Sequence, residues 1–187
     1  MGFPAMAKNQ EPGKEGRRPA RKSSGARLVL VPWIPILHVD DDSNDRELLL
    51  AATLEAAVPF RVHSVSDAEQ AIAFLSGTGT YADRRRFPLP RLILLDLKMP
   101  GSTGIDILRW VRTHPELSRT PVIILSGSES EEDMRQAYAC GADAYAIKPL
   151  GFNALVEMIK RVNLGWCLTP QNASPEINRD FPLRLLL

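Results

Sequence analysis

Acidic, basic and hydroxyl side chains that could bind a phosphate group follow several apolar stretches of this chain, at the points where strands are expected to end. Asp40 and Asp41 follow one such stretch, Asp96 a second, Ser126 a third and Lys148 a fourth. The carboxyl ends of parallel strands meet at one edge of an open sheet, where ligands bind. These residues are therefore expected to form one site, although they are far apart in the chain.

The residue types at this expected site suit the transfer of a phosphoryl group. Crowded carboxylates repel each other, and Mg²⁺ is commonly held by one or two carboxylates together with water and phosphate oxygens. We expect Asp41 and Asp96 to bind Mg²⁺ directly and Asp40 to act through water. A carboxylate is also a nucleophile toward phosphorus, and an acyl phosphate on Asp96 would find partners in the Lys148 ammonium and the Ser126 hydroxyl.

Strand and helix patterns alternate from residue 34 onward. Short apolar stretches predict strands over residues 34–39, 60–65, 91–95, 121–125 and 143–147. A helical pattern follows each of them, with helix caps expected near Asn44, Ser66 and Ser128 and stop signals at Gly77 and Pro115.

This alternation implies right-handed crossovers and a parallel sheet with helices on both faces. We therefore predict an α/β fold built on a doubly wound, five-stranded parallel sheet. The expected strand order is 2-1-3-4-5, which places Asp40 and Asp96 on adjacent strand ends.

The chain has 187 residues, enough for one ordinary domain with tails. Residues 1–32 hold seven Lys/Arg and two Glu, so the formal net charge of +1 leaves −4 (+1 minus +5) on the remainder. Because this segment has few large apolar residues, we expect a disordered basic tail at 1–32, a domain at 33–168 and a C-terminal tail at 169–187. The basic tail could contact nucleic acid or an anionic membrane, or only aid solubility.

No membrane span or secretory signal is expected. The apolar stretch at 28–37 is broken by two prolines and is shorter than the ~20 residues that a bilayer requires. The cysteines, Cys140 and Cys167, lack the spacing of metal ligands. We therefore expect a cytoplasmic protein.

Five motifs resemble the receiver domain of two-component response regulators, and the resemblance covers about residues 34–168. The motifs are Val-Asp-Asp-Asp at 39–42, Leu-Asp-Leu-Lys-Met-Pro-Gly at 95–101, Gly104, Ile-Leu-Ser-Gly at 124–127 and Tyr-Ala-Ile-Lys-Pro at 145–149. The resemblance implies a flavodoxin-like receiver fold, with Mg²⁺ as cofactor and a histidine kinase as phosphodonor. It also implies a phosphoacceptor signalling protein, not an enzyme, which promotes only its own phosphorylation and dephosphorylation.

The same resemblance gives each site residue a role. It implies that Asp96 accepts the phosphoryl group and that Asp40 and Asp41 organise Mg²⁺ together with Asp96 and the backbone carbonyl of Lys98. The further roles it implies are a switch pair formed by Ser126 and Tyr145, phosphoryl binding by Lys148, and tuning of dephosphorylation by Lys98 and Ser128.

Within the family, the chain most resembles single-domain regulators that partner phytochrome-type kinases. The resemblance lies in the long loop at 78–90, the segment 114–117 and the helix that ends in Trp166. Trp166 extends past the region that a five-stranded sheet can cover, and exposed aromatic residues commonly mark interfaces. We expect a homodimer through this face, the alternative being that Trp166 folds back onto its own domain.

The expected output is through protein contacts. The roughly twenty residues after Trp166 are too few for a helix-turn-helix domain, so no DNA-binding domain is expected. Ser126 stands where threonine is the commoner choice of the family, and the lost methyl group predicts a looser switch.

Two other functions remain as alternatives. A receiver-like binding module that is not phosphorylated is one, although such a module has no need to keep all five motifs. The other is a haloacid-dehalogenase-like phosphatase, which would use the aspartates at 40–42 as its Asp-x-Asp motif, but no acidic pair follows Lys148 as that class requires.

Overall fold

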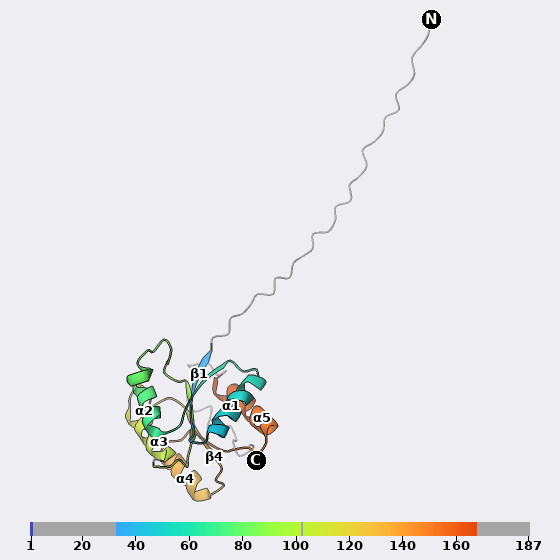
Figure 1. Ribbon diagram of the computed structural model, residues 1–187. Coiled ribbons are helices and arrows are strands. Elements are labelled where there is room, and N and C mark those ends of the chain that lie inside the picture. The colour runs from blue at the N-terminus through green and yellow to red at the C-terminus, as the bar shows by residue number, and fades with distance from the viewer. Residues whose placement is uncertain (2–32, 102, 168–187) are drawn as a thin grey trace. The chain divides into compact units, whose positions relative to one another are not determined.

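The computed structural model describes residue 1, residues 33–101 and residues 103–167 (Figure 1). The predicted tails at 1–32 and 169–187 lie outside the described residues. Within residues 33–167, helices and strands alternate as the sequence patterns indicated.

Five strands in this part of the chain form one parallel sheet. They are β1 (Ile34–Val39), β2 (Phe60–Val65), β3 (Leu92–Asp96), β4 (Val122–Ser126) and β5 (Ala144–Ile147). The order is β2-β1-β3-β4-β5, which confirms the predicted doubly wound topology. The register pairs Val39 with Leu95, so that the residues that follow β1 and end β3 lie side by side.

Helices cover both faces of the sheet (Figure 1). They are α1 (Ser43–Glu55), α2 (Ala68–Ser76), α3 (Gly104–Thr113), α4 (Glu131–Ala139) and α5 (Phe152–Val162), with two short turns, η1 (Gly79–Tyr81) and η2 (Asn163–Cys167). Side chains of α1 and α5 share one apolar cluster with the sheet, whereas α2, α3 and α4 share another. Successive residues of the central strands enter opposite clusters, which explains why these strands are apolar throughout.

All three predicted helix caps differ from the observed ones by one or two residues, and in α1 the cap is Asp42, not Asn44. Asp67, not Ser66, caps α2 by accepting a hydrogen bond from the backbone N–H of Gln70 at 2.8 Å. Ser130, not Ser128, caps α4. The reason is a local contact, because the Ser128 hydroxyl already donates a hydrogen bond to the Asp133 side chain in the first turn of α4.

The segment at 78–90, expected as a polar surface loop, is anchored to the end of α2 by residues within the loop. The guanidinium of Arg84 donates hydrogen bonds to the carbonyls of Phe74 and Leu75 at the end of α2. Tyr81 and Phe87 pack against the Phe74 ring, with ring centroids 5.3 and 6.1 Å away. The loop therefore closes the open end of α2 and extends the core.

The described helices include none that is both long and apolar enough to cross a membrane.

Candidate acidic site at the sheet edge

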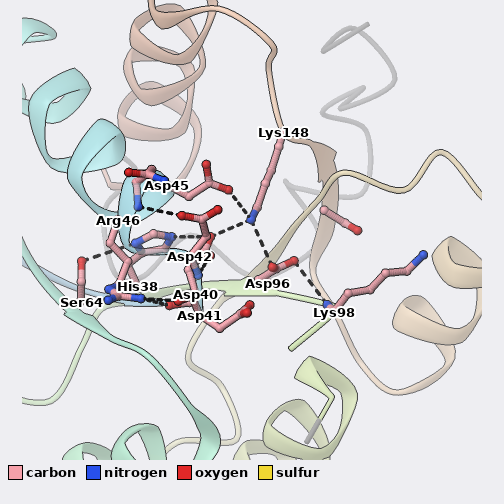
Figure 2. A network of polar contacts seen from close by, with 12 residues as sticks. His38, Asp40, Asp41, Asp42, Asp45, Arg46, Ser64, Asp96, Lys98 and Lys148 are labelled. Carbon is pink, nitrogen blue, oxygen red and sulfur yellow. Dashed lines mark hydrogen bonds and ion pairs between the residues drawn. The ribbon is translucent and has the colours of Figure 1, made fainter. Parts of the chain in front are cut away.

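The sheet brings three charged groups from separate strands to one point. The Lys148 ammonium, just after β5, lies 2.7 Å from Oδ2 of Asp40 and 3.1 Å from Oδ2 of Asp96 (Figure 2). Asp40 follows β1 and Asp96 ends β3, and these two strands are neighbours in the sheet. The long-range convergence inferred from the strand ends is therefore present in the structure.

Both aspartates are largely withdrawn from water, and their surroundings shift their pKa values in opposite directions. Asp40 is 1% exposed and Asp96 is 7% exposed. Burial would raise the pKa of Asp40, but hydrogen bonds from His38 and Lys148 outweigh it and the pKa lies below its ordinary value. Burial raises the pKa of Asp96, and Lys148 offsets only part of that rise. The more basic carboxylate, Asp96, is the better nucleophile while it is ionised.

The Lys148 ammonium is surrounded by carboxylates that accept its hydrogen bonds. In the part of the chain that the structure describes, its ammonium contacts Asp40, Asp96 and Oδ2 of Asp45, the last at 2.8 Å. Burial by itself would lower the pKa of Lys148, but these three carboxylates outweigh it and the pKa is raised. Lys148 therefore stays cationic and balances the buried negative charge.

The acidic residues fit a hard divalent cation. Carboxylate oxygens of Asp40, Asp41 and Asp96 all lie within 4.8 Å of one another. An all-oxygen donor set with space for water is the type that Mg²⁺ prefers. Oδ1 of Asp40 accepts a hydrogen bond from the Asp42 backbone N–H, and its Oδ2 faces Lys148, which suits the water-mediated role predicted for Asp40. A role for the backbone carbonyl of Lys98 stays a prediction.

Three residues of this site were missed by reasoning from the sequence. Asp45 reaches Lys148 from the first turn of α1, and Arg46 beside it donates hydrogen bonds to the carbonyls of Asp40 and Asp41 at 2.7 and 2.9 Å. The His38 ring is buried, with Nε2 3.5 Å from Oδ2 of Asp40. A signal was available for Asp45 and Arg46, because the first turn of a helix after a three-residue loop must lie near the end of the preceding strand.

The third aspartate of the run, Asp42, has a structural role. Its carboxylate accepts a hydrogen bond from the backbone N–H of Asn44 at 2.7 Å and caps α1. This agrees with the prediction that Asp40 and Asp41 are the members of this run that belong to the acidic site.

The two residues of the expected switch pair, Ser126 and Tyr145, both form hydrogen bonds with the backbone of Ser128. Ser126 is buried at the end of β4, and its hydroxyl oxygen accepts a hydrogen bond from the backbone N–H of Ser128 at 3.1 Å. The Tyr145 ring is buried, and its hydroxyl donates to the Ser128 carbonyl at 2.9 Å. A movement of this loop would therefore change the hydrogen bonds of both side chains.

Lys98 and Trp166 complete the residues singled out from the sequence. The Lys98 side chain is exposed and forms an ion pair with Asp133 of α4 at 3.2 Å, while its backbone N–H donates to Oδ1 of Asp96 at 3.4 Å. Trp166 belongs to η2, but its side chain is not among the described parts of the structure. Its predicted place in a dimer interface stays a prediction.

Known proteins resemble this chain over most of its length. The probable methanogenesis regulatory protein FilR2 of Methanothrix harundinacea is 34% identical over 145 residues, which are 74% of this chain and 88% of that protein. The response regulator RPA3017, in red light signaling of R. palustris, has a similar structure with a TM-score of 0.69, 32% identity and coverage of 73% of this chain and 96% of that one. The structure of the phosphorylated cyanobacterial phytochrome response regulator RcpA is similar with a TM-score of 0.67 and 32% identity, over 74% of this chain and 96% of that one.

A family model identifies the domain itself. The model of the response regulator receiver domain matches residues 36–160, a range that contains Asp40, Asp96 and Lys148 and so the whole acidic site. The matched range runs from within β1 to within α5 and so contains most of the sheet and its helices. This chain therefore belongs to the receiver-domain response regulators of two-component signalling and is homologous to phytochrome response regulators.

Proposed function

We propose that this protein is a stand-alone response regulator that accepts a phosphoryl group on Asp96 and signals through protein contacts. The observation that carries the proposal is the contact of the Lys148 ammonium with the buried carboxylates of Asp40 and Asp96, beside the exposed carboxylate of Asp41. An ion pair with only a structural role has no need of a third carboxylate that is exposed to solvent and lies within reach of a shared cation.

The reaction that fits this geometry is an in-line displacement at phosphorus. An oxygen of Asp96 forms a bond to the phosphorus of a phosphohistidine, and the P–N bond breaks with its electron pair going to the imidazole, which takes a proton from solvent. Asp41 and Asp96 would hold Mg²⁺ directly, with Asp40 through water and the Lys98 carbonyl as a further ligand. When bound, the ion supplies positive charge against the negative phosphoryl oxygens.

The chain's own residues would then stabilise the acyl phosphate. Lys148 already touches Asp96, so a phosphoryl group on that carboxylate places its oxygens within reach of the ammonium. The Ser126 hydroxyl, at the end of the next strand, is the second expected donor. A charge-assisted hydrogen bond of this kind is roughly twice as strong as a neutral one.

The decisive test is the mass of the intact protein after incubation with acetyl phosphate or phosphoramidate and Mg²⁺. One phosphoryl group is expected on the native chain and none on Asp96→Asn, which is nearly isosteric. Asp42→Asn is a matched control, because Asn is an equally good helix cap and the adduct should persist. An undiminished mass shift in Asp96→Asn would overturn the assignment. No adduct from either donor on the native chain would favour a binding module that is not phosphorylated.

We infer that the phosphodonor is a histidine kinase of the phytochrome type. Support comes from the two similar structures whose proteins act in red light signaling or are named phytochrome response regulators. Purified kinases of the phytochrome type should phosphorylate the chain faster than an unrelated histidine kinase does. Equal rates would remove the argument for this class of partner.

A homodimer that includes Trp166 completes the proposal. Light scattering on the chain truncated after Thr169 should give the mass of a dimer, and Trp166→Ala should lower it toward that of a monomer. A monomeric mass for the unmutated truncation, whether phosphorylated or not, would rule the dimer out.

A further inference from the structure

The Lys98 ammonium lies close to the proposed phosphoacceptor in sequence but is held elsewhere in space. Its backbone N–H donates to Asp96, whereas its side chain extends away from Asp96 and Lys148 (Figure 2). Nζ of Lys98 forms its ion pair with Oδ2 of Asp133, 3.2 Å away, in the first turn of α4. This pair joins the loop after β3 to the helix after β4.

Asp133 is itself fixed in place by a second contact. The same oxygen, Oδ2, accepts a hydrogen bond from the Ser128 hydroxyl at 2.5 Å. Hydrogen bonds from Ser128 and Lys98 lower the pKa of Asp133, so the carboxylate is ionised at neutral pH. The backbone of Ser128 is in turn bonded to Ser126 and Tyr145. Asp133 is thus a negatively charged and positioned acceptor at the rim of the site.

We propose that Asp133 is a positioning residue that holds the Lys98 ammonium away from the phosphoryl group on Asp96 and thereby shortens the lifetime of the acyl phosphate. The inference rests on the proposed function, because it requires phosphorylation of Asp96. A chain that lacked Asp133 would release an ammonium on a long, flexible side chain only two residues from the phosphoryl group.

The effect follows from the geometry of hydrolysis. Water attacks the phosphorus on the side opposite the Asp96 oxygen, loses a proton to solvent, and forms inorganic phosphate as the P–O bond breaks and its electron pair returns to the carboxylate. An ammonium paired with the phosphoryl oxygens would stand beside this path and obstruct the water. Asp133 and the phosphoryl group therefore compete for Lys98, and the outcome sets the rate.

The test uses Asp133→Asn in the full chain. The amide keeps the shape of the side chain, and its oxygen can still accept the Ser128 hydrogen bond, so only the charge that holds Lys98 is lost. After phosphorylation with acetyl phosphate and removal of the donor, the decay of the adduct followed by intact mass should be about two- to fivefold slower than in the native chain, as expected for an exposed ion pair. Glu132→Gln is a matched control, since Glu132 is exposed on the same turn and pairs with Arg135, and its decay rate should equal that of the native chain.

A double-mutant cycle separates this role from a structural one. Lys98→Met keeps the apolar stem and removes the ammonium, and its adduct should decay faster than that of the native chain. Adding Asp133→Asn to Lys98→Met should then change nothing. Slowing that persists in the Lys98→Met background, or no slowing by Asp133→Asn alone, overturns the inference while leaving the proposed function in place. Failure of every variant and of the native chain to take up phosphate would overturn both.

Discussion

Removal of the Lys148 charge is the most direct test of how this site is balanced. In Lys148→Met the apolar stem remains, but Asp40 and Asp96 keep their burial without their cation. Removing one partner of a buried ion pair costs about 3–5 kcal/mol. Because 23% of the Lys148 side chain is exposed, water compensates part of this loss, and we expect the free energy of unfolding to fall by about 2–4 kcal/mol at pH 7. The contact with Asp45, whose side chain is 38% exposed, adds about 1 kcal/mol or less.

The loss should depend on pH with a sign fixed by the two carboxylates. Asp40 has a depressed pKa in the native chain, so its contribution to stability is present above the ordinary pKa of about 3.9 and is lost as pH falls through the depressed value. Without Lys148, the part of that contribution that Lys148 supplies disappears, and the pKa values of both carboxylates rise, although His38 still opposes the rise at Asp40. The deficit of Lys148→Met should therefore be greatest near pH 7 and shrink as pH falls toward 4, where the carboxylates take up protons.

Urea denaturation in EDTA, repeated with 10-fold steps of Mg²⁺, measures both effects. Mg²⁺ should raise the stability of Lys148→Met more than that of the native chain, because the cation relieves a repulsion that the native lysine already offsets. This account of the site would be refuted if Lys148→Met and the native chain had the same free energy of unfolding at pH 7 in EDTA. It would also be refuted if the difference between them did not change with pH.

Three further predictions concern the switch pair, the approach of α3 to the sheet, and His63 of β2, whose ring packs against Phe74 and Phe87. Ser126→Ala should still be phosphorylated, but beryllofluoride should shift the NMR resonances of Tyr145 less than in the native chain; equal shifts would disprove the coupling. Gly104→Ala should lower the free energy of unfolding by about 3 kcal/mol or more, since an added Cβ collides with the backbone carbonyl of Asp96, and an unchanged urea midpoint would contradict this. Burial, together with the charge of Arg61, lowers the pKa of His63, so the unfolded chain takes up the proton first and stability should decline as pH falls below about 6.5. His63→Leu should remove this part of the pH dependence, and an identical slope in thermal melts would show that His63 is not its source.

The sequence alone determined the sheet order and the convergence of the main charges. The alternation of strands and helices predicts a doubly wound sheet with right-handed crossovers, and in its 2-1-3-4-5 order β1 and β3 are neighbours whose ends lie side by side. The positions of Asp40, Asp96 and Lys148 then follow from where each strand ends, because a strand that is buried on both faces stops at its first charged residue. Local patterns also located the αL glycine at the end of α2, Gly77, with φ of +68°.

Contacts between side chains from different loops were decided only by the tertiary structure. Nothing local in the sequence pairs Lys98 with Asp133, because the loop after β3 and the first turn of α4 meet only once the sheet is assembled. The cap of α4 depends instead on local contacts: the Ser128 hydroxyl donates to the Asp133 side chain, and the Ser130 hydroxyl accepts a hydrogen bond from the Asp133 backbone N–H. Periodicity and strand ends are properties of neighbouring residues, whereas the partner of an exposed charge depends on the path of every loop around it.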